Sequence, residues 1–166
     1  MPRPCLVLLG LWLGLVLASW AVATVNFRTV DRVLGPSMNP DLGRKLASIP
    51  PEDRRMVLRH LASEVNRWLF GAGGLAQVVL GLAVVALAWP AGGAARNLTL
   101  AAATLVLGQA LVAHAIVDLG RSIDFLPRPL APDIARRFGL LHGVYVVSDV
   151  LKAALLVAAA WVGRRG

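Results

Sequence analysis

Four long apolar runs alternate with segments that carry most of the charge. The runs cover residues 4–24, 68–89, 97–117 and 138–161. A helix needs ~20 mostly apolar residues to cross the hydrocarbon core of a bilayer. The pattern therefore predicts an all-α fold, a four-helix transmembrane bundle that makes one membrane domain of residues 1–166.

Tryptophans support these boundaries in part. Trp68, Trp89 and Trp161 lie at the ends of apolar runs, where amphipathic rings favour the headgroup layer of a membrane. Trp12 and Trp20 lie inside the first run, which is a less typical position.

Prolines predict where two of the helices begin. The sequence Ser48-Ile-Pro-Pro-Glu-Asp combines proline with acidic residues, as the first turn of a helix often does. A helix beginning near Pro51 would continue into the second run, with a helical extension that projects into the cytoplasm before that span. Pro132-Asp133 predicts the start of the fourth helix in the same way. The first clear stop after the first run is Gly35-Pro36, which leaves room for that helix to continue past residue 24.

The composition agrees with a lipid environment. Hydrophobic residues make up 57% of the chain and charged residues 16%, whereas a soluble domain has roughly 25% charged residues. The mean hydropathy of +0.68 argues against a disordered chain. The single cysteine, Cys5, argues against a disulfide scaffold.

The basic residues predict an orientation. Segments 25–67 and 118–137 carry twelve Lys or Arg residues, namely Arg28, Arg32, Arg44, Lys45, Arg54, Arg55, Arg59, Arg67, Arg121, Arg128, Arg136 and Arg137. The opposite side carries four, namely Arg3, Arg96, Arg164 and Arg165. Because positive residues stay in the cytoplasm, we expect both termini outside the plasma (inner) membrane.

The same basic segments, chiefly the long loop 25–67, suggest a partner. The net charge is +8, and each Lys or Arg near anionic lipid headgroups is worth ~1 kcal/mol. A nucleic-acid partner is not expected, because no basic face with stacking aromatic residues or a recognition helix is visible. A partner membrane protein is left open.

The N-terminus allows a second interpretation. Arg3, the apolar run and Ala21-Val22-Ala23 imitate a secretory signal peptide with its cleavage site. The run is longer than the about 7–15 apolar residues of such a peptide, and we therefore expect the first span to be retained.

Polar residues on the fourth run share one helix face. His142, Tyr145, Asp149 and Lys152 are spaced by three, four and three residues, which places them along one side of a helix. Asp149 and Lys152 lie near mid-span, where each costs ~2.5–3.5 kcal/mol on insertion scales. We predict that they pair with each other. Gln77 and Gln109 lie at similar depth and are expected to bridge helices through hydrogen bonds.

The three histidines form the only constellation with metal-ligand chemistry. His60 precedes Glu64 and Arg67 on one helix face, and His114 precedes Asp118 and Arg121 at the same spacing. With His142, all three fall in the cytoplasmic half of the bundle. Imidazole and carboxylate ligands suit a divalent transition metal. Two helix-borne histidines could instead bind haem, but haem is less expected than a metal ion because no specific motif is present. Hydrogen bonding within a buried polar network that includes Glu64, Asp118 and Tyr145 is the alternative.

Glycines on two runs predict close helix packing. Gly10 and Gly14 form a GxxxG motif on the first run, and Gly71, Gly74 and Gly81 continue the face of His60. Small residues allow neighbouring membrane helices to approach each other. Packing within one chain is expected rather than a dimer contact.

Two short motifs carry a family resemblance. Gly10-Leu-Trp-Leu-Gly14 and Phe138-Gly-Leu-Leu-His142-Gly143 resemble a family of small four-helix integral membrane proteins of unknown function. That family is distantly similar to the eukaryotic transmembrane protein linked to copper and cisplatin resistance. The resemblance implies a four-span bundle and makes His142 the position of most interest. In this chain Asp149 and Lys152 replace the uncharged polar residue expected there.

We therefore expect an integral membrane protein that acts as a non-catalytic module or as a subunit of a complex. The alternative is a protein that handles a metal or a small solute through the His/Asp cluster. No nucleophile–base pair, Gly-rich phosphate loop or cysteine pair favours an enzyme.

Overall fold

The computed structural model describes residues 1–36 and 38–165 as an all-α bundle. Its elements are α1 (Arg3–Val33), α2 (Pro40–Leu46), α3 (Pro51–Ala88), the short 3-10 helix η1 (Trp89–Ala91), α4 (Gly93–Ile123) and α5 (Pro132–Arg165). The four long helices are each long and apolar enough to cross a membrane. They are compatible with a multi-pass membrane protein, as the apolar runs predict.

Local sequence rules account for most of the helix ends. Helix α3 begins at Pro51 and α5 at Pro132, both as predicted, because proline lacks the N–H that a first turn leaves unpaired. Asn39 caps α2, since its side-chain oxygen accepts hydrogen bonds from the backbone N–H groups of Asp41 and Leu42. Between α3 and α4 the chain reverses at Gly92 and Gly93, which both have positive φ.

The predicted basic loop 25–67 is largely helical, which confirms the helical extension expected from Pro51, and it also contains a short helix that was not predicted. Residues up to 33 continue α1, residues 40–46 form α2, and residues from 51 onward begin α3. Helix α3 has 38 residues and is about 57 Å long at 1.5 Å per residue. It is therefore much longer than the ~30 Å hydrocarbon core.

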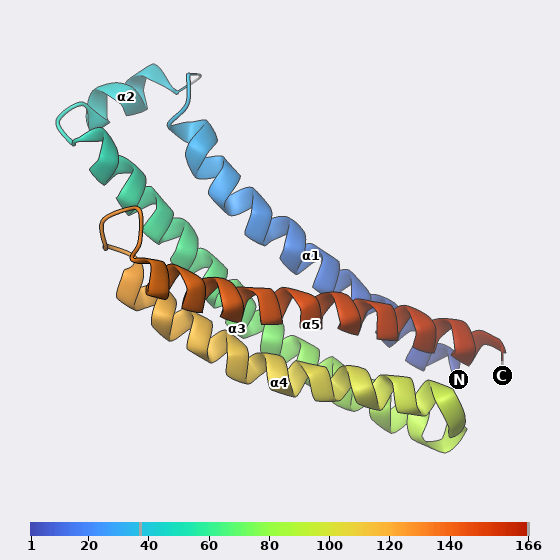
Figure 1. Ribbon diagram of the computed structural model, residues 1–166. Coiled ribbons are helices and arrows are strands. Elements are labelled where there is room, and N and C mark those ends of the chain that lie inside the picture. Colours follow the sequence, from blue (N-terminus) through green and yellow to red (C-terminus); the bar gives the residue numbers. More distant parts are fainter. Residues whose placement is uncertain (37, 166) are drawn as a thin grey trace.

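The four long helices are arranged as a ring of neighbours. Contacts join α1 to α3, α3 to α4, α4 to α5 and α5 back to α1. Both termini lie at one end of the bundle beside the α3–α4 connection, and α2 and the loop before α5 lie at the other end (Figure 1).

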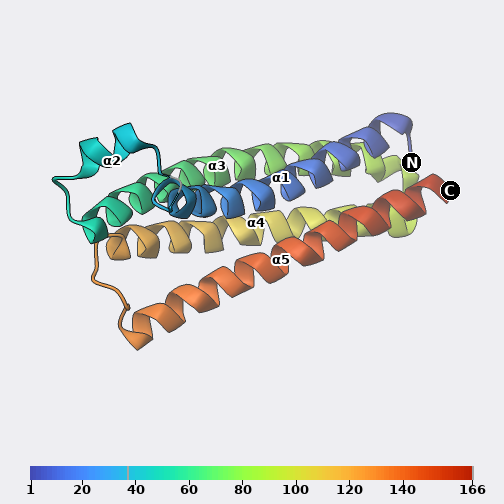
Figure 2. The same cartoon turned by 90° about the horizontal axis from the view of Figure 1, so that it is seen from above.

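The bundle is tight at one end and splayed at the other. From above, the first half of α5 diverges from α4 and meets the bundle only toward its C-terminal half (Figure 2). Residues 132–148 include none that is buried, whereas Asp149, Lys152, Leu156, Ala159 and Gly163 are buried. We call the end with the termini the closed half and the end with α2 the open half.

An apolar core fills the closed half. Its buried members are Cys5, Leu9, Trp12, Val16, Val84, Ala88, Ala102, Val106, Leu156 and Ala159. The Trp12 ring reaches α3 at Gly81, where an added Cβ would lie 2.9 Å from Trp12 Cη2. Gly81 is therefore the one predicted packing glycine that the structure brings against another helix.

The other predicted packing glycines do not contact a neighbouring helix. At Gly10, Gly14, Gly71 and Gly74, no heavy atom of the described residues lies within 4 Å of an added Cβ. Within this chain their packing prediction was therefore wrong. Spacing alone gives the face on which a glycine lies, but not which face meets another helix.

Candidate functional site

A cavity between the four long helices occupies the open half. Its volume is about 280 Å³. Residues from all four helices line it, namely Ala23, Thr24, Phe27, Ser63, Asn66, Arg67, Phe70, Ala113, Ile116, Val117, Gly120, Phe138, His142 and Tyr145. The cavity lies where the first half of α5 diverges from α4.

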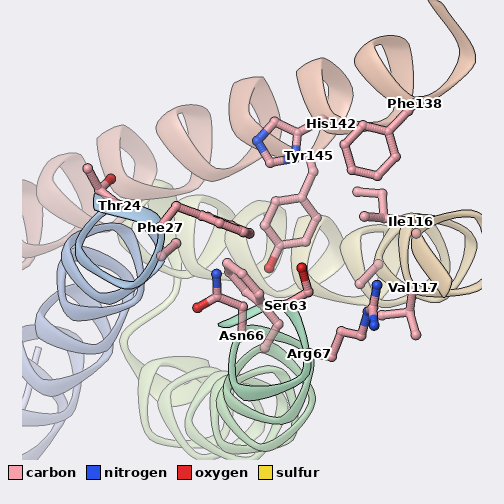
Figure 3. A pocket seen from close by; sticks show the side chains of 14 residues that line it. Thr24, Phe27, Ser63, Asn66, Arg67, Ile116, Val117, Phe138, His142 and Tyr145 are labelled. Atoms are coloured by element: carbon pink, nitrogen blue, oxygen red, sulfur yellow. The ribbon is translucent and has the colours of Figure 1, made fainter. Parts of the chain in front are cut away.

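Aromatic rings from three helices approach this cavity. Phe27 extends from α1 and Tyr145 from α5 into the space between the helices, and Phe138 lies beside His142 on α5 (Figure 3). Phe70 and Tyr145 meet edge to face with centroids 5.7 Å apart. Phe138 and His142 are nearly parallel at 6.1 Å. The lining is therefore mainly apolar and aromatic, with a few polar groups.

A buried polar network lies between this cavity and the apolar core. Lys152 Nζ lies 2.5 Å from Asp149 Oδ1, as the spacing predicts, and these side chains are 1% and 4% exposed. Gln109 Nε2 donates to Asp149 Oδ1 over 3.0 Å, and Lys152 Nζ donates to Gln109 Oε1 over 2.7 Å. Both charges are thus neutralised inside the bundle, which removes the cost of an isolated ion.

The network also includes a residue that the sequence analysis did not assign to it. Trp20 Nε1 of α1 donates to Asp149 Oδ2 over 2.5 Å. We call Trp20, Gln109, Asp149 and Lys152 the central network. It joins α1, α4 and α5 at one level of the bundle. The signal was present in the sequence, because an indole N–H inside an apolar run needs an acceptor.

Gln77 joins two helices through a hydrogen bond, as its depth predicts. Its Oε1 accepts a hydrogen bond from Trp12 Nε1 over 3.3 Å, which joins α3 to α1. Tyr145 contributes only its backbone oxygen to the buried network, as an acceptor from Gln109 Nε2 over 3.3 Å.

A cluster of charged residues lies beside the cavity, on α3 and at the end of α4. Arg67 Nη1 and Nη2 each donate to an oxygen of Asp124 over 2.8 Å. Arg67 also donates to Glu64, and Arg121 Nε lies 3.6 Å from the Glu64 carboxylate. Together with His60, these residues form what we call the ion cluster, which joins α3 to the end of α4.

Asp124 is the acceptor at the centre of the ion cluster. His60 Nδ1 lies 2.8 Å from Asp124 Oδ2. Burial opposes ionisation of Asp124, but the hydrogen bonds and positive charge of Arg67 and His60 outweigh it, so the pKa of this carboxyl is lowered. Gly120 leaves room for the guanidinium, because an added Cβ would lie 3.1 Å from Arg67 Nη2. Asp124 was absent from the predicted site because it follows the third apolar run.

The three histidines do not form one metal site. Among the described residues, the group with metal-ligand spacing is His60, Glu64 and Asp124, whose ligand atoms lie within 4.8 Å of one another. His142 instead lines the cavity. His114 is 81% exposed and lies 3.3 Å from Asp118, which is 61% exposed. The prediction of a buried Asp118 was therefore wrong, because its side chain lies exposed on the surface of α4.

Comparison with known proteins gave no relative. The chain matched no protein-family model, no curated protein and no solved structure.

Proposed function

We propose that this protein is a non-catalytic integral membrane module whose open half binds a small membrane-dissolved molecule. The observation that carries the proposal is the cavity between α1, α3, α4 and α5, which is lined by aromatic side chains. Binding sites for small molecules are typically concave and mainly apolar, with few well-placed polar groups. The closed half then serves as the rigid frame that holds the cavity open.

The membrane placement belongs to the same proposal. At the closed end, Arg96 lies over the Trp89 ring and Arg165 over the Trp161 ring, at 5.3 and 4.3 Å from the centroids. Such pairs suit a headgroup layer. The basic residues of segments 25–67 and 118–137 would then face anionic headgroups on the cytoplasmic side of the plasma membrane. Both termini would lie outside. The family resemblance stays a prediction beside this proposal.

A photoreactive amphiphile tests the site directly. The full chain in lipid nanodiscs is irradiated with a dodecanol that carries a diazirine, and the labelled residues are mapped by mass spectrometry. We expect saturable labelling of cavity residues. The variant Ala113→Trp fills the cavity and should abolish that labelling. The matched control Leu111→Trp, at a position 77% exposed on the same helix, should leave it unchanged.

Labelling that rises linearly with probe concentration, and is equal in both variants, would contradict the proposed site. Reporter fusions at the C-terminus test the orientation separately. Cys5 is a poor topology probe, because its side chain is buried and its Sγ lies 3.7 Å from the Val84 backbone oxygen.

A divalent metal is the second candidate ligand, at His60, Glu64 and Asp124. In the structure the Arg67 guanidinium forms ion pairs with the carboxylates of Glu64 and Asp124. A metal ion would have to displace it, so Arg67→Ala should raise the affinity for Zn²⁺. Metal analysis of the purified protein tests this candidate, with His60→Ala as the variant and His114→Ala as the matched control.

A further inference from the structure

Three polar side chains of the cavity make no hydrogen bond within the described residues. Thr24 donates to the Trp20 backbone oxygen, and Asn66 accepts a hydrogen bond from Asn26. Within residues 1–36 and 38–165, the Tyr145 hydroxyl, the Ser63 hydroxyl and the His142 ring nitrogens have no hydrogen-bond partner. Figure 3 shows the Tyr145 hydroxyl directed toward Ser63 across the space.

The charge around the cavity is balanced. Arg67 is the only Lys or Arg among the lining residues, and it is paired with both Asp124 and Glu64. No carboxylate belongs to the lining. An anionic ligand would compete with two carboxylates for Arg67, and a cationic ligand would find no counter-ion. A neutral ligand therefore fits this electrostatic environment best.

The size and the lining favour a ring. An apolar cavity of about 150 Å³ binds benzene, so the present cavity of about 280 Å³ has room for a substituted ring. Phe27, Phe70, Phe138 and Tyr145 supply aromatic faces and edges around it. Such contacts stabilise a bound ring beyond the burial of its surface.

From these observations we propose that the cavity binds a neutral amphiphile whose head is a ring with a hydroxyl or carbonyl oxygen, such as a phenol, quinol or quinone. The ring lies among the aromatic side chains, and its oxygen bonds to the Tyr145 and Ser63 hydroxyls. Phe27 and His142 are exposed at the edge of the cavity, so an apolar tail leaves past them toward lipid. This ligand class rests on the proposed function of the cavity.

Competition between matched amphiphiles tests the class. The diazirine-labelled dodecanol is bound to the full chain in nanodiscs and displaced by 4-octylphenol, 4-octylbenzoate or unlabelled dodecanol. The first is neutral with a ring, the second is anionic with the same ring, and the third is neutral without a ring. We expect half-displacement by 4-octylphenol at a concentration about tenfold lower than by either of the others, which corresponds to about 1.4 kcal/mol.

Variants of single hydroxyls test the contact itself. Loss of one hydrogen bond of about 1 kcal/mol weakens binding about fivefold, and we expect this shift for 4-octylphenol with Tyr145→Phe. The matched control Ser148→Ala removes a hydroxyl of α5 that bonds to the Val144 backbone oxygen and lies outside the cavity. It should leave the displacement curve unchanged.

Each remaining outcome overturns a defined part of the inference. Equal or stronger displacement by 4-octylbenzoate would refute a neutral head, and equal displacement by dodecanol would refute a ring. An unchanged curve for Tyr145→Phe would refute the hydroxyl contact. In these three cases the cavity still binds an amphiphile and the proposed function stands. If labelling of the unsubstituted chain is not saturable, and Ala113→Trp is labelled to the same extent, both proposals are refuted.

Discussion

The closed and open halves of the bundle are built from the same four helices but are stabilised differently. In the closed half, small and large apolar residues pack across α1, α3, α4 and α5, and Trp12 lies against Gly81. In the open half, an ion cluster joins α3 to the end of α4, while the first half of α5 has no buried residue. The closed half is therefore close-packed, whereas the open half, with its charged contacts at the periphery, holds a cavity.

The central network lies at the boundary between the two halves. It fixes α5 to α1 and α4 at Asp149, so that the helix can diverge on one side while it stays packed on the other. One buried polar level therefore separates a close-packed half from a half that holds a cavity within a single bundle.

Breaking the central network should give the largest effect on stability. The variant Asp149→Leu leaves the buried Lys152 ammonium without its counter-ion, which costs about 3–5 kcal/mol. The double variant Asp149→Leu/Lys152→Leu should be less destabilised, since it removes both charges. The free energy of unfolding in detergent measures both, with Val147→Leu, at a position 67% exposed, as the control. Equal losses for the single and double variants would disprove the pairing.

Removal of the ion cluster should have a smaller effect that is limited to the open half. Arg67→Ala leaves two carboxylates without their common donor, and hydrogen bonds to charged groups contribute about 1.5–3 kcal/mol. We expect faster hydrogen exchange in α4 near Asp124 and unchanged exchange around Trp12. Equal changes at both ends would show that the halves are not independent.

The ion cluster also predicts a dependence on acid. Because the pKa of Asp124 is lowered from the ordinary aspartate value of 3.8, its contribution to stability is complete only above about pH 5, where the unfolded chain is also ionised. The contribution is lost as the pH falls through the lower pKa of the folded protein. Unfolding of Asp124→Asn, measured from pH 7 to pH 3, should therefore show a smaller loss than the unsubstituted chain. Parallel curves would contradict this assignment.

Two glycines on α3 should distinguish the closed half from the rest of the helix. Gly81→Ala places a Cβ against Trp12, and overpacking costs about 1–3 kcal/mol, partly offset by a gain in helix propensity of about 1 kcal/mol. A net loss near 1 kcal/mol is expected. Gly74→Ala has open space around its Cβ and should be neutral or slightly stabilising, as measured by thermal unfolding in detergent.

The smallest effect is expected at the exposed histidine. His114→Leu removes a side chain that is 81% exposed and lies 3.3 Å from the exposed Asp118. Surface substitutions usually change stability by less than about 0.5 kcal/mol, and we expect that range in the same unfolding assay. A larger loss would indicate that His114 is covered in the membrane by a partner.

Local patterns in the sequence determined the four apolar helices, their starts at Pro51 and Pro132, and the pairing of Asp149 with Lys152. Each of these follows from residues within one or two helical turns, where backbone geometry sets the spacing. Tertiary structure decided that Trp20 meets Asp149, that Asp124 rather than His114 joins His60, and that Gly81 alone of the predicted glycines packs against another helix. These contacts depend on how each helix is rotated and tilted against its neighbours. That arrangement results from the packing of many side chains at once, and no single stretch of the chain encodes it.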